Sequence, residues 1–186
     1  MNFKQFIDYA KKSPQKVSIS MGGQWNSHDF FRARMEKFFG IKFLRIPFQG
    51  GAPAIQAVAG GHVDSSTPFI SEGLPSIEGK MVTAIAVSGR ERAVALPNVH
   101  TIKELGYDFI HVSWRALGLP IGVSPEIIPF LDGVFSKTFK DPEFVKDFVQ
   151  AGVNPYFRPH EEFVKYYKEE YSQYSALLKE LGFEVK

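Results

Sequence analysis

The fold is decided by the stretch Arg45-Ile46-Pro47-Phe48-Gln49-Gly50-Gly51-Ala52-Pro53-Ala54-Ile55. An apolar run over residues 43–46 predicts a buried strand, two glycines follow it, and a helical pattern continues to Ala59. A strand, a glycine turn and a helix start present free backbone N–H groups and partial positive charge at one point. Gly50 and Gly51 have no side chain to keep a ligand away. The turn therefore suits an anion such as a carboxylate, although the same glycines could simply make a tight corner.

Strands and helices alternate on both sides of this turn. After a first helix that ends at Pro14, hydrophobic patterning predicts three strands, over residues 16–21, 43–46 and 62–66. A helix is predicted after each strand, over residues 27–39, 52–59 and 68–77. A further apolar, β-branched run at residues 81–87 is typical of a central strand. This alternation favours an α/β fold with a mainly parallel sheet.

The last third of the chain is mostly helical. Proline-acid start signals and an aromatic stripe predict helices over residues 125–139, 142–150 and 160–181. Before them, Thr101 can cap a short helix that ends at Gly106, and residues 109–119 read as one or two strands. Because the helical part makes little sheet of its own, we expect it to pack on the first part, on a partner chain or on a missing segment.

Composition excludes several classes of protein. The net charge is +2 and the basic residues are spread along the chain, which argues against a nucleic-acid partner or an acidic membrane surface. The absence of cysteine excludes disulfides, thiolate metal sites and a cysteine nucleophile. No apolar run approaches the roughly 20 residues that span a bilayer. Met1 opens directly into an amphipathic segment without a signal peptide, so either the protein is cytoplasmic or the chain begins downstream of its natural start.

Polar or glycine-rich turns follow the three predicted strands, at residues 22–28, 49–54 and 65–68. Ligands of open α/β sheets bind outside the carboxyl ends of the strands, so we expect these turns to meet at one edge. Together they offer backbone N–H groups, hydroxyls, amides and one imidazole, a set that suits a carboxylate or carbonyl ligand. The candidate ligand-binding residues are Gly23, Gln24, Asn26, Ser27, His28, Gln49, Gly50, Gly51, Ala52 and Thr67.

The same residues do not form a catalytic or metal-binding set. Ser27, His28 and Asp29 are adjacent on a predicted helix, where neighbouring side chains point about 100° apart and cannot relay a proton. No pair of histidines stands four residues apart, and the glycine turn lacks the spacing of nucleotide-binding loops. We expect no catalytic residue, no metal and no cofactor. Structural alternatives stay open, since Asn26 and Ser27 could cap the helix and His28 could be a buried structural histidine.

The order and spacing of the motifs resemble one family, the substrate-binding receptors of tripartite tricarboxylate transporters, also called Bug or TctC-like extracytoplasmic solute receptors. The motifs that carry the resemblance across nearly all 186 residues are Met21-Gly22-Gly23, Ser27-His28, Ile46-Pro47-Phe48-Gln49-Gly50-Gly51-Ala52-Pro53-Ala54, Gly60-Gly61-His62-Val63-Asp64, Ala84-Ile85-Ala86-Val87-Ser88 with Arg92, Leu96-Pro97-Asn98-Val99, Thr101-Ile102-Lys103-Glu104-Leu105-Gly106, Gly118-Leu119-Pro120-Ile121-Gly122-Val123-Ser124-Pro125, Lys140-Asp141-Pro142-Glu143, Gly152 and Glu170.

The resemblance implies a periplasmic, two-lobed binding protein of the type II-like class that captures a small organic acid, such as a di- or tricarboxylate, for membrane permease subunits. Residues 15–112 would form the α/β second lobe, and residues 113–186 a helical segment that returns to an incomplete first lobe. The chain resembles only about the C-terminal two-thirds of a family member. The signal peptide and the first-lobe loop that clamps the other carboxylate are absent, so we expect a fragment with impaired binding.

The sequence departs from the family pattern at three places, of which the bulky loop at residues 24–26 would narrow or reshape the pocket. Phe48 stands where the family usually has tyrosine, His100 stands where it usually has proline, and Gln24-Trp25-Asn26 is bulkier than usual. Two other functions remain as alternatives, the effector-sensing domain of a transcription regulator and a small α/β enzyme. Neither an N-terminal helix-turn-helix nor a nucleophile–base pair is visible. We also expect exposed apolar surface on the fragment to be covered by self-association into a homo-oligomer.

Overall fold

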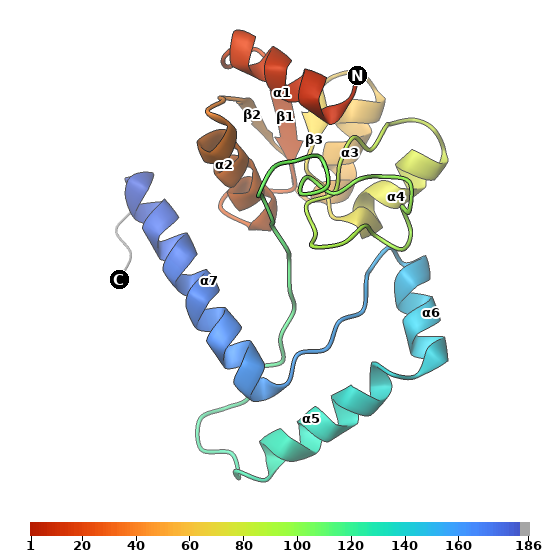
Figure 1. The fold of residues 1–186 in the computed structure, drawn as a ribbon, viewed down its shortest axis with the longest axis vertical. Coiled ribbons are helices and arrows are strands. Elements are labelled where there is room, and N and C mark those ends of the chain that lie inside the picture. Colours follow the sequence, from red (N-terminus) through yellow and green to blue (C-terminus); the bar gives the residue numbers. More distant parts are fainter. Residues whose placement is uncertain (183–186) are drawn as a thin grey trace. The chain divides into compact units, whose positions relative to one another are not determined.

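In the computed structural model, which describes residues 1–182, three parallel strands organise the N-terminal part of the chain (Figure 1). The strands are β1 at Ser18–Met21, β2 at Leu44–Pro47 and β3 at Ser65–Ser66, in the order β2-β1-β3. Ser18 lies opposite Leu44, and Ile19 lies opposite Ser65. The predicted α/β fold with a parallel sheet is confirmed, and the turns after the three strands start from one edge of the sheet.

Helices cover both faces of the central strand. The helices α1 (Phe3–Lys12) and α2 (Ser27–Phe39) share an aromatic core with Ile19 and Met21, which point to one face of β1. Ser20 points to the other face, where its hydroxyl donates to the carbonyl of Ala54 in α3 (Gly51–Ala59) at 2.8 Å. The helix α4 (Ile70–Glu78) packs against α3. The predicted helices of this region are therefore confirmed, and α2 and α3 both begin at the carboxyl edge of the sheet.

Side chains hold the two-residue strand β3 in place. The Asp64 carboxylate accepts hydrogen bonds from the backbone N–H of Ser18 at 2.8 Å and from its hydroxyl at 2.6 Å. Two residue pairs further along, the Ser66 hydroxyl donates to the carbonyl of Ser20 at 3.2 Å. These bonds replace the longer ladder of an ordinary strand, and they place the third polar turn beside the first one.

The prediction of a buried strand at residues 43–46 is correct for the strand and wrong for its burial. Phe43 is buried, but Leu44 is 48% exposed and Arg45 is exposed as well. In the described residues β2 pairs with β1 alone, so it is an edge strand. An apolar run does not reveal whether a strand has one neighbour or two.

Three other predictions of regular structure are wrong. The run at residues 81–87 forms no strand within the described chain; only Val87 makes a bridge, to Thr101. Its side chains instead pack on two separate apolar clusters, which leaves no continuous partner strand. Residues 109–119 are likewise irregular. Thr101 and Glu104 exchange the expected capping hydrogen bonds at 2.7 and 2.9 Å, but the segment turns away at Gly106 before a helix forms.

The chain divides into two units, of which residues 1–115 with 149–154 form the first. The second contains α5 (Ile127–Thr138), most of α6 (Pro142–Gln150) and α7 (His160–Glu180). Within it, the rings of Phe139 and Phe144 lie 5.0 Å apart, and the Asp132 carboxylate accepts from the N–H of His160 at the start of α7. No residue of α5 or α6 is buried in the described structure. Among the described helices, none combines the length and apolarity needed to cross a bilayer.

We expect the chain to associate with itself in solution. Phe130 is 66% exposed and Tyr156 is 69% exposed in the second unit, and apolar surface of this kind favours association. Size-exclusion chromatography with light scattering should give a mass above that of one chain, and Phe130→Glu should lower it. A monomer mass for the unchanged chain at the highest accessible concentration would contradict this expectation.

Candidate functional site

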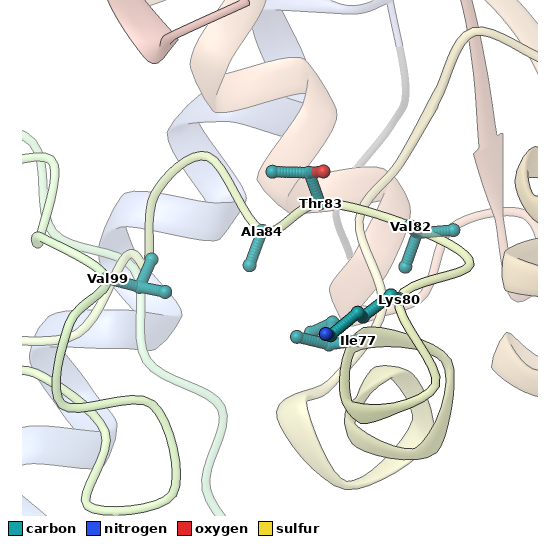
Figure 2. Close-up of a pocket in the computed structure, with 6 residues that line it drawn as sticks. All are labelled: Ile77, Lys80, Val82, Thr83, Ala84 and Val99. Atoms are coloured by element: carbon teal, nitrogen blue, oxygen red, sulfur yellow. The ribbon is translucent and has the colours of Figure 1, made fainter.

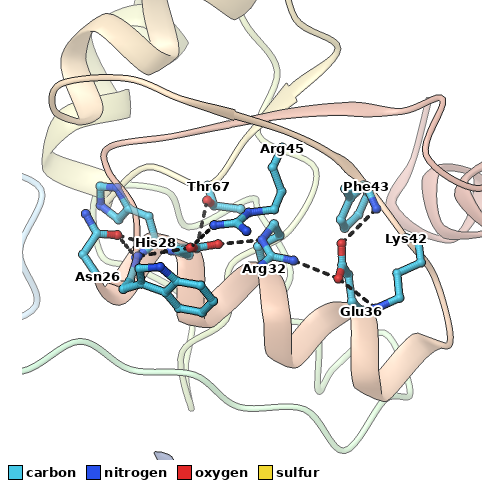
Figure 3. Close-up of polar contacts among 10 residues, drawn as sticks. Asn26, His28, Arg32, Glu36, Lys42, Phe43, Arg45 and Thr67 are labelled. Atoms are coloured by element: carbon cyan, nitrogen blue, oxygen red, sulfur yellow. Dashed lines mark hydrogen bonds and ion pairs between the residues drawn. The ribbon is translucent and has the colours of Figure 1, made fainter. Parts of the chain in front are cut away.

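Asn26 closes the loop between β1 and α2 (Figure 3). Its side-chain oxygen accepts from the backbone N–H groups of His28 at 3.1 Å and Asp29 at 3.3 Å. Its amide nitrogen donates to the carbonyl of Gly22 at 3.0 Å. Both ends of the Asn26 amide therefore serve the loop itself, as the capping alternative requires.

Buried Asp29 ties this loop to α2 and to β2. The side chain is 1% exposed, and its carboxylate accepts from Nε of Arg32 at 2.7 Å and from an Nη atom of Arg45 at 2.6 Å. It also accepts from the backbone N–H of Trp25 at 3.1 Å, where the backbone is left-handed with φ 55°. Arg45 in turn lies over the Trp25 ring, 5.2 Å from its centroid. The single Asp29 carboxylate thus joins the bulky loop to α2 and to β2.

The ionic chain continues along the helix, as Figure 3 shows. Arg32 donates to Glu36 at 2.8 Å, and Glu36 accepts from the backbone N–H of Phe43 at 2.9 Å. Sequence reasoning missed this network. The signal was present, because acid and base residues at positions 29, 32 and 36 stand three and four residues apart on one helix.

Replacing Asp29 with Asn should destabilise the first unit strongly. Arg32 is only 4% exposed, so it would lose one of its two carboxylate partners without regaining water and would keep Glu36 alone. Breaking a buried pair in this way costs roughly 3–5 kcal/mol. Urea unfolding followed by tryptophan fluorescence measures it, because Trp25 and Trp114 both lie in this unit.

The matched control is Asp8→Asn, which breaks the exposed Lys4–Asp8 pair and should leave the midpoint almost unchanged. Equal effects of the two substitutions would show that the Asp29 network does not stabilise the fold.

His28 lies between the first and the second turn. Its Nδ1 accepts from the backbone N–H of Gly22 at 3.0 Å, and its ring packs edge-on against Phe69 at 4.3 Å between centroids. Burial lowers the pKa of His28, the Glu72 carboxylate opposes this shift, and Arg115 adds to it. The ring is therefore neutral near pH 7 and carries its proton on Nε2. That buried Nε2 has no hydrogen-bond acceptor among the described residues.

The second turn brings the start of α3 next to this histidine. Gly50 precedes the helix with φ 109°, a conformation that favours glycine, and provides no side-chain cap. A methyl group at Gly22 would overlap both the His28 ring and the backbone nitrogen of Gly51. The two glycine turns are therefore in direct contact, as their common sheet edge predicts.

Some of the remaining candidate residues lie beside His28 and its loop, and the others are exposed to solvent. The Thr67 hydroxyl donates to the carbonyl of His28 at 3.4 Å, so the third turn joins the same cluster. Gly23 has φ 144° beside the Asn26 amide, and the Ser27 hydroxyl lies 3.4 Å from Nε2 of His111. The side chains exposed at the rim are Gln24, Gln49 and Ala52.

His111 is a buried residue near the site that sequence reasoning did not find. It is 7% exposed, and Arg34 lies 3.2 Å from its Nδ1. Because arginine only donates, Nδ1 accepts, and the ring proton sits on Nε2 facing Ser27. Burial above all, with the charge of Arg34 and the nearby His28, lowers the pKa of His111 to about 3. A lone histidine in an irregular segment gave no sequence signal for this role.

Stability should fall as the pH is lowered from neutral, and His111 should account for much of the loss. The imidazole has a pKa of about 6.5 in the unfolded chain and of about 3 in the fold, so only the unfolded state binds the proton between these values. The contribution of neutral His111 to the free energy of unfolding is complete above pH ~6.5. It is lost as the pH falls toward ~3, by roughly 1.4 kcal/mol per pH unit. Urea midpoints at pH 7 and pH 5.5 measure it. His111→Gln should flatten the dependence; an unchanged slope would contradict the assignment.

A separate pocket of about 290 Å³ opens elsewhere in the first unit (Figure 2). Its lining consists of Ile77, Lys80, Val82, Thr83, Ala84 and Val99. These side chains are mainly apolar, and none comes from the three polar turns. The pocket lacks the converging hydrogen-bond donors that fix an anion, so we place the candidate site at the turns.

Residues 1–183 match the family described as the tripartite tricarboxylate transporter family receptor, TctC. The chain belongs to this family. A curated relative, the "UPF0065 protein in gbd 5'region" of Cupriavidus necator, is 26% identical over 181 residues, which are 96% of this chain and 54% of the relative. The chain thus spans about half the length of the curated relatives it matches. The family membership confirms the resemblance drawn from the motifs.

Solved structures share the fold of the chain. One is an R. palustris protein with adipate, with a TM-score of 0.82 and 19% identity over 97% of this chain and 61% of that one. Another is MatC from Rhodopseudomonas palustris with bound malate, with a TM-score of 0.74 and 20% identity over 95% of this chain and 62% of that one. At these identities the likeness shows the fold alone.

Proposed function

We propose that this chain is part of a receptor that captures a small organic carboxylate for a tripartite tricarboxylate-type transporter. The observation that carries the proposal is the meeting of Gly22, His28 and Gly51 at the carboxyl edge of the sheet. There the uncapped start of α3 offers backbone N–H groups and partial positive charge. Such a helix start is a natural site for a carboxylate.

Two kinds of hydrogen-bond donor would hold the ligand carboxylate. Gly50, Gly51 and Ala52 supply backbone N–H groups, which Gly50 exposes through its left-handed backbone. His28 adds a neutral, buried Nε2–H donor that completes no hydrogen bond within the described chain. Donors that are fixed in advance cost little to order when the ligand binds.

The other candidate residues shape the site and its rim. Gly23, Asn26 and Ser27 hold the first loop, and Thr67 fixes the backbone of His28. Gln24 and Gln49 are exposed and can reach more distant polar groups of a ligand. We infer that the two glutamines tune selectivity rather than supply most of the affinity.

The relatives support a carboxylate as the ligand class. Adipate and malate, which appear with two solved structures of the same fold, are both dicarboxylates. A dicarboxylate needs partners at both ends, and this chain spans about half the length of its curated relatives. We therefore propose that residues 15–112 form one lobe of the clamp, that residues 113–186 belong to the other, and that this chain alone binds weakly. A periplasmic location and membrane permease partners belong to the same proposal.

Catalysis is not part of the proposed function. The family is described as a receptor family, and one solved structure of the same fold is a periplasmic binding protein. Nδ1 of His28 already accepts from Gly22, so it cannot take a proton from a ligand. The Asp29 carboxylate is bound by two arginines. The residues that would have to act as base and acid are thus engaged in holding the loop.

Binding is tested by thermal shift with adipate, malate and uncharged adipamide. At ten times the Kd a ligand stabilises by about 1.4 kcal/mol, which raises the Tm of a chain of this size by roughly 3–5 °C. The carboxylates should raise the Tm and the diamide should not. Because this chain covers only part of its relatives, the same panel is applied to a full-length receptor that contains it.

A matched pair of variants locates the site. Thr67→Val removes the hydroxyl that supports His28 and should weaken binding about tenfold, the effect of one hydrogen bond. Thr83→Val makes the same change in the separate pocket and should have no effect. If no carboxylate stabilises the full-length receptor, or if only Thr83→Val weakens binding, the proposed function at these turns is wrong.

A further inference from the structure

One carboxylate of the chain already lies at the start of α3. Glu72, in the first turn of α4, accepts from the backbone N–H of Phe69 at 2.9 Å through its Oε2. The same carboxylate lies so close to Gly51 that a methyl group on that residue would overlap it. Its Oε2 is also 3.3 Å from Nε2 of His28. Glu72 thus lies against Gly51 and His28, the two residues that the proposed function assigns to a ligand carboxylate.

This position is explained by the charges and the shape of the site. A helix start attracts negative charge, and Gly51 leaves room for a carboxylate beside the backbone. The approach to His28 is close, yet it does not complete a hydrogen bond, because Nε2 stays without an acceptor among the described residues. The Glu72 side chain is 27% exposed, so it has a path toward solvent.

We propose that Glu72 is an internal competitor that occupies the carboxylate subsite at Gly51 and His28 and determines which ligands enter it. The inference rests on the proposed function, since the subsite is the one assigned to the ligand. A ligand carboxylate and the Glu72 carboxylate cannot share the place, because like charges at such a distance repel. A ligand must therefore displace Glu72 and take over its contacts, and its affinity is reduced by the cost of that displacement.

The test uses Glu72→Gln, which keeps the length of the side chain and its capping of α4 but removes the charge. Acetate is the probe, and the backbone amide signals of Gly51 and His28 in ¹⁵N NMR are the readout. Acetate should bind Glu72→Gln about tenfold more tightly than the unchanged chain. The control is Glu78→Gln, which makes the same charge change at the other end of α4 and should leave the affinity unchanged.

Three results would overturn the role of Glu72. These are equal acetate affinity in the unchanged chain and Glu72→Gln, an equal gain in Glu78→Gln, and the absence of any acetate effect on the Gly51 and His28 signals. A different result would reject the proposed function itself: adipate and malate would then raise the Tm of neither the unchanged chain nor Glu72→Gln. If adipate stabilises the protein but acetate binds the unchanged chain and Glu72→Gln equally, the proposed function stands and only the competition by Glu72 is rejected.

Discussion

The buried carboxylate of Asp29 is the interaction on which the site depends. It joins the first turn of α2, the loop at Trp25 and the edge strand that carries Arg45. A carboxylate that is 1% exposed persists only with charged or hydrogen-bonding partners, so these three elements must come together when it is buried. The loop is thereby folded back toward the sheet edge, where Gly22 meets the start of α3.

Three helices begin at this edge, and their starts differ in how they are capped. The start of α2 is capped by Asn26, and the start of α4 is capped by Glu72. The start of α3 follows Gly50 and has no side-chain cap of its own. The ligand site that we propose is therefore the helix start that lacks a side-chain cap, and the Glu72 carboxylate that caps α4 lies beside it. This carboxylate orders the start of α4, and we propose that it also limits access to the ligand subsite.

Local signals predicted what is local, and tertiary contacts decided the rest. The bounds of α2 follow from Asn26 before it and from Gly40 after it, whose φ of 63° ends the helix. The meeting of the turns followed from parallel topology. Residues 81–87 look like a strand, but a strand needs a lateral partner that no periodic pattern reveals. Glu72 reaches the site only through the packing of α4 on α3, so no motif pointed to it.

The central claim is that the turns after β1 and β2 hold one carboxylate of the ligand. A crystal structure of the chain grown with saturating adipate tests it most directly. The account predicts a ligand carboxylate within hydrogen-bond distance of the Gly51 N–H and of Nε2 of His28, with Glu72 turned away. Adipate bound instead in the pocket beside Ile77 and Val99, or the absence of adipate from the turns, would contradict it.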